Sequence, residues 1–362
     1  MSCNHDAQDN DFFSLKQVEV VDIIESESIY IKSVNNPVLD EKQEFIYFIS
    51  DGQQVLKVNL DNGRLYSVFN PTDSLLVSLY KKTQLHYSNL NFVADYNELI
   101  KDDLRLKIDR VVISSEEAYI TLTIFTNYLG RYNNQDAAIT SFFPFLYRIS
   151  AQPKDFVVHI NHKIDYSNVK INDDLSTEGV DLINLQGGFY IKDSIMFAKN
   201  IFSPVSPSSK LLYRVVLSEN SQVIKADSLL DYHTNPKLHR REDVIINSYF
   251  FHQFDDNIYF TEGKNIYLID DNKKDSVNIL KEKYFHISSF SFLNSVSILC
   301  NIKSDTSNVK KTIVYNKKEN KKTLIKEHEK NVLSVLFGHD KMYEIIKEED
   351  AYKIVKYHIN RN

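Results

Sequence analysis

The chain has 362 residues, with 43 Lys+Arg, 49 Asp+Glu and a formal net charge of −6. This acidic balance argues against a dedicated nucleic-acid binder, which needs a concentrated basic surface. No run of about 18 apolar residues occurs, so the sequence predicts no membrane-spanning helix. The 22 Tyr and 22 Phe favour an all-β chain, and with only 8 Gly we expect Asn and Asp to form many turns.

Residues 1–14 are polar and acidic, so we expect a disordered tether ahead of a single domain at 15–362. Cys3 follows a small residue and precedes acidic positions, which resembles the mature end of a bacterial lipoprotein. In that interpretation the natural chain began with a signal peptide ending before Cys3, and the Cys carries a lipid. The alternative is an ordinary flexible start with a chance Cys, since no apolar h-region is present.

A pattern of an apolar residue, Tyr and often a second apolar residue recurs along the rest of the chain. These short stretches of high β propensity, bounded by polar turn residues, predict strands. They group into five hairpins, at 55–69, 146–160, 211–226, 266–280 and 312–325. Further strands are expected ahead of most of them, at 45–49, 119–125, 195–198, 257–260, 295–299 and 341–346.

Four antiparallel strands repeated in this way predict the blades of a β-propeller. Six blades account for the hairpins, with the last strand at 352–357 pairing with an N-terminal strand at 18–23 to close the ring. A seven-bladed ring stays open, because the interval from Val55 to Leu146 fits either one blade with an insertion or two degenerate blades. A short helix at 97–101 favours the insertion.

The stretch from Glu44 to Val68 resembles the six-bladed β-propeller lipoproteins of bacterial outer membranes, which are related in fold to NHL and TolB-type propellers. The resemblance implies an outer-membrane address, on the cell surface or the periplasmic face. It also implies a binding role, and it brings no set of catalytic residues with it.

Two polar segments are candidate binding sites, and both have a plainer interpretation. The segment 126–136 contains Tyr128, Arg131 and Tyr132, and its composition suits a recognition surface as well as a plain long loop. The segment 231–243 contains His233, His239, Arg240 and Arg241 in a predicted inter-blade loop. A solvated loop is the plain interpretation; the functional ones are an anion- or substrate-contacting rim and, for His239, general acid–base chemistry.

Four other features have mainly structural interpretations. His159 and His162 lie at opposite-facing positions of a strand, which is poor metal-ligand geometry. Cys300 is expected to be a small buried hydrophobe, although a disulfide with Cys3 stays open. Phe142–Phe145 is expected in the core, with an exposed docking patch as the alternative. The Lys-rich segment 310–330 is expected to be a hairpin turn with solvated charges.

The sequence contains no recognisable catalytic, metal or cofactor motif. It has neither a Gly-x-Ser-x-Gly elbow nor a phosphate-binding glycine loop, and Cys3 and Cys300 alone do not have the cysteine spacing of a zinc site. The absence of Trp argues against WD-type repeats. We therefore predict a non-enzymatic, lipid-anchored binding or scaffold propeller that holds a partner protein or an extracellular ligand. The alternative is a propeller hydrolase or lyase acting on an extracellular glycan or peptide.

Overall fold

The fold is known from a computed structural model of the chain. It describes residues 13–40, 42–86, 104–114, 117–132, 135–149, 157–159, 189–192, 195–199, 211–217, 223–231, 251–255, 257–262, 264–269, 276–280, 285–304 and 306–361.

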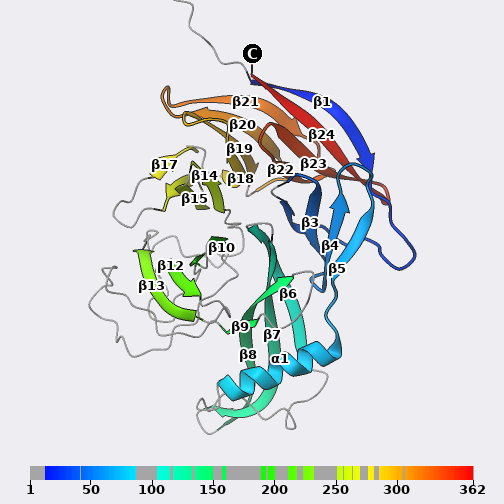
Figure 1. Ribbon diagram of the computed structural model, residues 1–362, viewed down its shortest axis with the longest axis vertical. Helices are drawn as coiled ribbons and strands as arrows, with labels where there is room; N and C mark the ends of the chain where they lie inside the picture. The colour runs from blue at the N-terminus through cyan, green and yellow to red at the C-terminus, as the bar shows by residue number, and fades with distance from the viewer. Residues whose placement is uncertain are drawn as a thin grey trace, which may run out of the picture. The chain divides into compact units, whose positions relative to one another are not determined.

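These residues form six four-stranded sheets and one helix (Figure 1). In five sheets the strands lie side by side in chain order, as in β2-β3-β4-β5, and the sixth has the order β1-β24-β23-β22. Neighbouring strands run antiparallel, as in the first of these sheets. This up-and-down order is the blade topology of a β-propeller, so the predicted all-β propeller fold is confirmed.

The chain divides into two compact units, one formed by Met1–Ile23, His252–Leu268 and Asp275–Asn362 and the other by Ile24–Phe251 and Ile269–Lys274. The three sheets of the second unit consist of β2 (Asn35–Leu39), β3 (Phe45–Ser50), β4 (Gln54–Asn59) and β5 (Leu65–Phe69); β6 (Arg105–Ser114), β7 (Glu117–Tyr132), β8 (Gln135–Ile149) and β9 (Val157–His159); and β10 (Phe189–Lys192), β11 (Ile195–Lys199), β12 (Leu211–Leu217) and β13 (Val223–Asp231).

The other three sheets lie essentially in the first unit. They consist of β14 (Phe251–Phe254), β15 (Asn257–Glu262), β16 (Asn265–Leu268) and β17 (Ser276–Asn278); β18 (Phe285–Phe292), β19 (Ser297–Ser304), β20 (Lys310–Asn316) and β21 (Lys321–His328); and β22 (Val332–Phe337), β23 (Lys341–Glu348), β24 (Ala351–Arg361) and β1 (Phe13–Asp22).

Both ends of the chain lie in one sheet, as predicted. β1 pairs antiparallel with β24, with Val20 opposite Val355 and Val21 opposite Ile354, and the blue and red strands run side by side in Figure 1. A 2.6 Å ion pair between Lys356 and Glu19 joins the same two strands. β1 begins at Phe13, slightly before the predicted end of the tether, because Phe13 packs on a buried apolar cluster around Leu299.

The five predicted hairpins are all present, and the two strands of each pair antiparallel. Cys300 lies in β19 with no exposed surface, so its interpretation as a buried strand residue is confirmed, and its thiol is free. Burial raises the pKa of this thiol well above its ordinary value.

One helix, α1 (Asp73–His86), was not predicted. The Thr72 hydroxyl caps it by accepting a hydrogen bond from the Leu75 amide at 3.2 Å. Leu79 and Tyr80 are buried against a cluster that includes Ile108 and Ile120 of the second sheet. α1 therefore covers this core, and the predicted helix at 97–101 lies outside the described residues. Within the described part of the chain, no helix is long and apolar enough to span a membrane.

The structure corrects the interpretation of the segment around Tyr128 as a plain long loop, because this segment is a strand. β7 continues to Tyr132 and pairs with β8 along its length, so that Tyr128 lies opposite Ile139 and Arg131 opposite Asp136. The β-branched and aromatic residues on both strands sustain the pairing further than the polar composition suggested. Phe142–Phe145 lies on β8 opposite β7.

Candidate functional site

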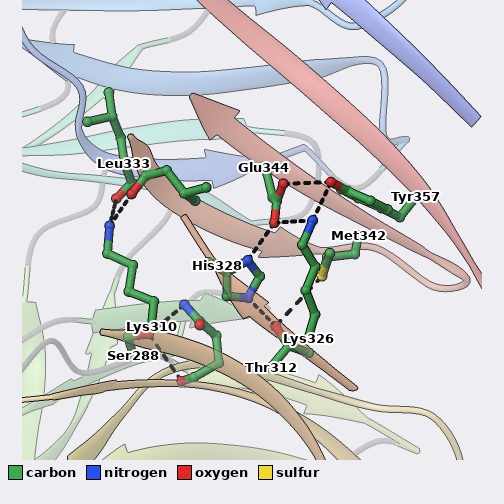
Figure 2. Close-up of polar contacts among 11 residues, drawn as sticks. Ser288, Lys310, Thr312, Lys326, His328, Leu333, Met342, Glu344 and Tyr357 are labelled. Atoms are coloured by element: carbon green, nitrogen blue, oxygen red, sulfur yellow. Dashed lines mark hydrogen bonds and ion pairs between the residues drawn. The ribbon is translucent and has the colours of Figure 1, made fainter. Parts of the chain in front are cut away.

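The most connected polar cluster in the described residues lies between the sheets β18–β21 and β22–β1 (Figure 2). Lys326 and His328 are two residues apart on β21, and Met342 and Glu344 are two residues apart on β23. Because side chains alternate along a strand, each pair shares one face of its sheet. Thr312 on β20 and Tyr357 on β24 complete the set, which we call the Glu344 network.

Glu344 is the centre of this network. Its side chain is only 4% exposed, and Oε1 lies 2.5 Å from His328 Nδ1 and 2.9 Å from Lys326 Nζ. The Tyr357 hydroxyl donates to Oε2 at 2.7 Å, and the Lys326 ammonium donates to the Tyr357 oxygen and lies 4.0 Å from the centre of its ring. Three donors therefore compensate a carboxylate that would otherwise be costly to bury.

The pKa of Glu344 shows whether burial or hydrogen bonding has the larger effect on this carboxyl group. Burial raises the pKa of a carboxyl group, but the hydrogen bonds from His328, Lys326 and Tyr357 lower it further than burial raises it. The pKa of Glu344 is therefore below its ordinary value, and the group is a carboxylate at neutral pH. For Tyr357, burial and the hydrogen bond to this carboxylate both raise the pKa of the phenol, which stays a donor.

The other side of the His328 ring faces Thr312, with Nε2 2.7 Å from the hydroxyl oxygen. A carboxylate only accepts, so Nδ1 must donate to Glu344, and a neutral ring then accepts the Thr312 proton at Nε2. Every polar atom of the His328 ring thus has a partner.

A hydroxyl, an imidazole and a carboxylate in this order form the arrangement that activates a nucleophile in hydrolases. Here Thr312 has no exposed surface, His328 has an exposed side-chain fraction of 0%, and the Thr312 hydroxyl also lies 3.7 Å from the Met342 sulfur. A substrate cannot reach the hydroxyl in this packing. The geometry therefore favours a structural connection between two sheets over catalysis.

Further polar contacts join the same two sheets. Lys310 Nζ donates to the backbone carbonyls of Val332 and Leu333, the latter at 3.0 Å. Burial, with a contribution from Lys303, lowers the pKa of this ammonium. The Ser289 hydroxyl also donates to the Val335 carbonyl at 3.2 Å. The Lys-rich hairpin is thus only partly solvated. The prediction of solvated charges is wrong for Lys310 and Lys326, whose ammonium groups make contacts between the two sheets.

Few of the predicted site residues can be placed. His233, His239, Arg240, Arg241, His162 and Cys3 lie outside the described residues. Tyr128, Arg131 and Tyr132 lie on β7, and His159 ends β9. Across the described ranges, no group of three His, Cys, Asp or Glu side chains is arranged to hold a metal ion. The binding surface proposed for these residues stays a prediction.

The Glu344 network was missed by the sequence analysis. The available signal was a single carboxylate in the apolar strand Met342-Tyr343-Glu344-Ile345-Ile346, since an acidic residue at such a position needs partners. A second signal was the spacing of Lys326 and His328, which places both on one face of a strand. Neither signal identifies which strand would contact Glu344 or the pair Lys326 and His328.

No family model matches the chain, and no curated protein matches it in sequence. Among solved structures, the chain is similar to the β-propeller domain of Cps50 (Swd1) from Myceliophteria thermophila, with 8% identity, a TM-score of 0.41 and coverage of 96% of this chain and 100% of that one. It is also similar to the WD40 repeats of RRP9, with 10% identity, a TM-score of 0.43 and coverage of 95% and 100%. Similarity at this level assigns no family, partner or activity to the chain. The chain contains no Trp and therefore has no WD dipeptide.

Proposed function

We propose that the chain is a non-enzymatic binding or scaffold propeller with six blades, one for each four-stranded sheet. The observation that carries this proposal is the burial of the Glu344 network, the most connected polar cluster among the described residues, in which the Thr312 hydroxyl is inaccessible. Blades built from repeated sheets leave the connecting loops free to vary, and such loops commonly carry binding residues.

The finer proposal concerns location and partner. A lipid on Cys3 would anchor the propeller to a bacterial outer membrane, on the cell surface or the periplasmic face, with the membrane contacted only through that lipid. The ligand would be a protein partner in an outer-membrane complex or an extracellular molecule, and neither nucleic acid nor a cofactor is proposed. Support comes from the polar segment around Cys3 and from the family resemblance of the stretch Glu44 to Val68.

Two measurements test these parts separately. Metabolic labelling with an alkyne fatty acid, applied to the gene with its natural upstream sequence, is expected to label the protein but not its Cys3→Ser variant. Affinity capture from native membranes is expected to recover a defined partner, and to lose it when Arg240 and Arg241 are both changed to Glu. Charge reversal at Lys16 and Lys318, which are exposed, is the matched control. Capture of the chain alone, with turnover on a panel of glycans or peptides, would instead support the hydrolase or lyase.

A further inference from the structure

β1 is an edge strand of its sheet. Its one strand neighbour is β24, and along its length Lys16, Gln17, Val18, Glu19, Val20 and Asp22 are exposed. The pairing shifts register between Gln17 and Glu19, and Val18, which lies at this irregularity, is 65% exposed. Edge strands are among the first elements of a fold to open locally, because they are paired on one side only.

The Glu344 network supports the strand on which β1 pairs. Tyr357, the residue opposite Gln17 in the register of β1 and β24, donates its hydroxyl hydrogen to Glu344. Glu344 in turn accepts hydrogen bonds from Lys326 and His328 on β21 of the neighbouring sheet. A continuous path of hydrogen bonds therefore runs from one sheet through β23 and β24 to the N-terminal strand.

We infer that the Glu344 network is an acid-sensitive latch that holds the sheet containing both chain ends. When Glu344 takes up a proton, it keeps one oxygen as a good acceptor and turns the other into a hydroxyl that faces the donors. The ion pair with Lys326 is lost, and the hydrogen bonds from His328 and Tyr357 weaken. β24 then loses its side-chain connection to β21, and β1 opens with it.

The charged and titratable groups around Glu344 stabilise its carboxylate form, so the latch is expected to be closed at neutral pH and to open in acid. β21 contributes Lys326 and His328, β24 contributes Tyr357, and Glu329, just after β21, acts on Tyr357 by its charge. β20 and β23 contribute the uncharged Thr312 and Met342. The stabilisation from a carboxyl group whose pKa is lowered in the folded state is complete above its ordinary pKa, and it is lost as the pH falls through the folded value.

Hydrogen exchange of the full chain, followed by mass spectrometry between about pH 2.5 and pH 7 and corrected for intrinsic rates, tests the latch, because this range extends below the ordinary pKa of a Glu carboxyl group. In the wild-type protein we expect the protection of β1 and β24 to fall on acidification by about tenfold or more, ahead of the sheet β2–β5. Glu344→Gln is expected to show low β1 protection at every pH. Tyr357→Phe keeps the carboxylate but removes one donor, so its opening is expected to move to higher pH by up to about one unit.

Glu327→Gln is the matched control, because Glu327 on β21 is exposed and pairs with Lys311 of its own sheet at 2.6 Å. Its β1 protection is expected to follow the wild type. The latch is refuted if β1 protection is equally pH-dependent in wild type and Tyr357→Phe with the same midpoint. It is also refuted if all sheets lose protection together, which would indicate global acid unfolding. If Glu344→Gln does not fold, the shift in Tyr357→Phe alone decides.

Discussion

Replacing Glu344 by Gln is expected to lower the free energy of unfolding strongly at neutral pH. The carboxylate accepts from His328, Lys326 and Tyr357, and hydrogen bonds to a charged group contribute about 1.5–3 kcal/mol each. A neutral amide keeps part of these bonds, but it leaves the Lys326 ammonium without its counter-ion. Breaking a buried ion pair by removing one partner costs about 3–5 kcal/mol.

Partial solvent exposure of Lys326 lowers the cost of breaking its ion pair with Glu344. The Lys326 side chain is 26% exposed, whereas that of Glu344 is 4% exposed, so the stranded ammonium can regain some hydration. We therefore expect a loss of about 3 kcal/mol, at the lower end of the range for buried pairs. Equilibrium urea unfolding followed by far-ultraviolet circular dichroism measures it.

The matched control is Glu348→Gln, since the Glu348 side chain is 47% exposed and its pair with Lys353 should contribute under about 1 kcal/mol. A double-mutant cycle with Lys326→Met isolates the pair, and we expect a coupling above about 1 kcal/mol. A loss for Glu344→Gln no larger than that of the control would refute the reasoning that the buried network joins the two sheets.

Three further substitutions test other parts of the structure. Thr312→Val removes the hydroxyl that is hydrogen-bonded to His328 Nε2 without changing the shape of the side chain, and a loss of about 1–3 kcal/mol in urea unfolding is expected; no loss would contradict a contribution of this hydrogen bond to stability. Gly52→Ala should cost about 1 kcal/mol, because Gly52 has φ of 66° while the nearest side-chain atom to an added Cβ is at 3.8 Å, so a neutral result would contradict the left-handed backbone. In a Cys3→Ser background, the buried Cys300 thiol, whose pKa is raised by burial, is expected to react with a disulfide reagent only when urea unfolds the chain. Reaction in the folded protein at the rate of a free thiol would place Cys300 at the surface.

A fourth test replaces Asp109 on β6, whose contribution to stability depends on pH in the opposite direction to that of Glu344. Burial raises the pKa of this carboxyl group despite a hydrogen bond from Thr123 and the charge of Lys107. A raised pKa means that the folded state binds the proton more tightly, so the cost of the charged form grows as the pH rises. Asp109→Asn is therefore expected to compare more favourably with the wild type at pH 7 than at pH 4, by up to about 1 kcal/mol in urea unfolding, and a difference of the opposite sign would contradict this assignment.

The repeated strands could be predicted because their signal is local. Val55–Leu60 and Leu65–Phe69 are short segments rich in apolar residues on either side of Asp61-Asn62-Gly63, and Gly63 has the positive φ that such a turn uses. The pairing of the two chain ends followed from counting strands, since an unpaired strand near Tyr352 needed a neighbour. These inferences need only neighbouring residues and the avoidance of open edges.

The missed features depend on residues distant in sequence. α1 has only a weak apolar stripe and forms because Leu79 and Tyr80 find a buried cluster on another sheet. Tyr128 was assigned to a loop by its polar neighbours, yet β8 supplies a paired strand opposite it. Glu344 contacts His328, 16 positions away on the neighbouring sheet, and Tyr357, 13 positions away on the next strand of its own sheet. Composition and spacing do not encode such contacts.

The most direct test of the central claim is a cysteine cross-link between the two chain ends. Glu19 and Lys356 face each other in the register of β1 and β24, so Glu19→Cys with Lys356→Cys in a Cys3→Ser background should form an intramolecular disulfide on mild oxidation. The control, Glu19→Cys with Lys347→Cys, places the second thiol on β23, which is not adjacent to β1. A fast intramolecular bond in the first variant and none in the control is the predicted result. A disulfide that forms only between molecules, or equally in both variants, would contradict a sheet shared by the two ends of the chain.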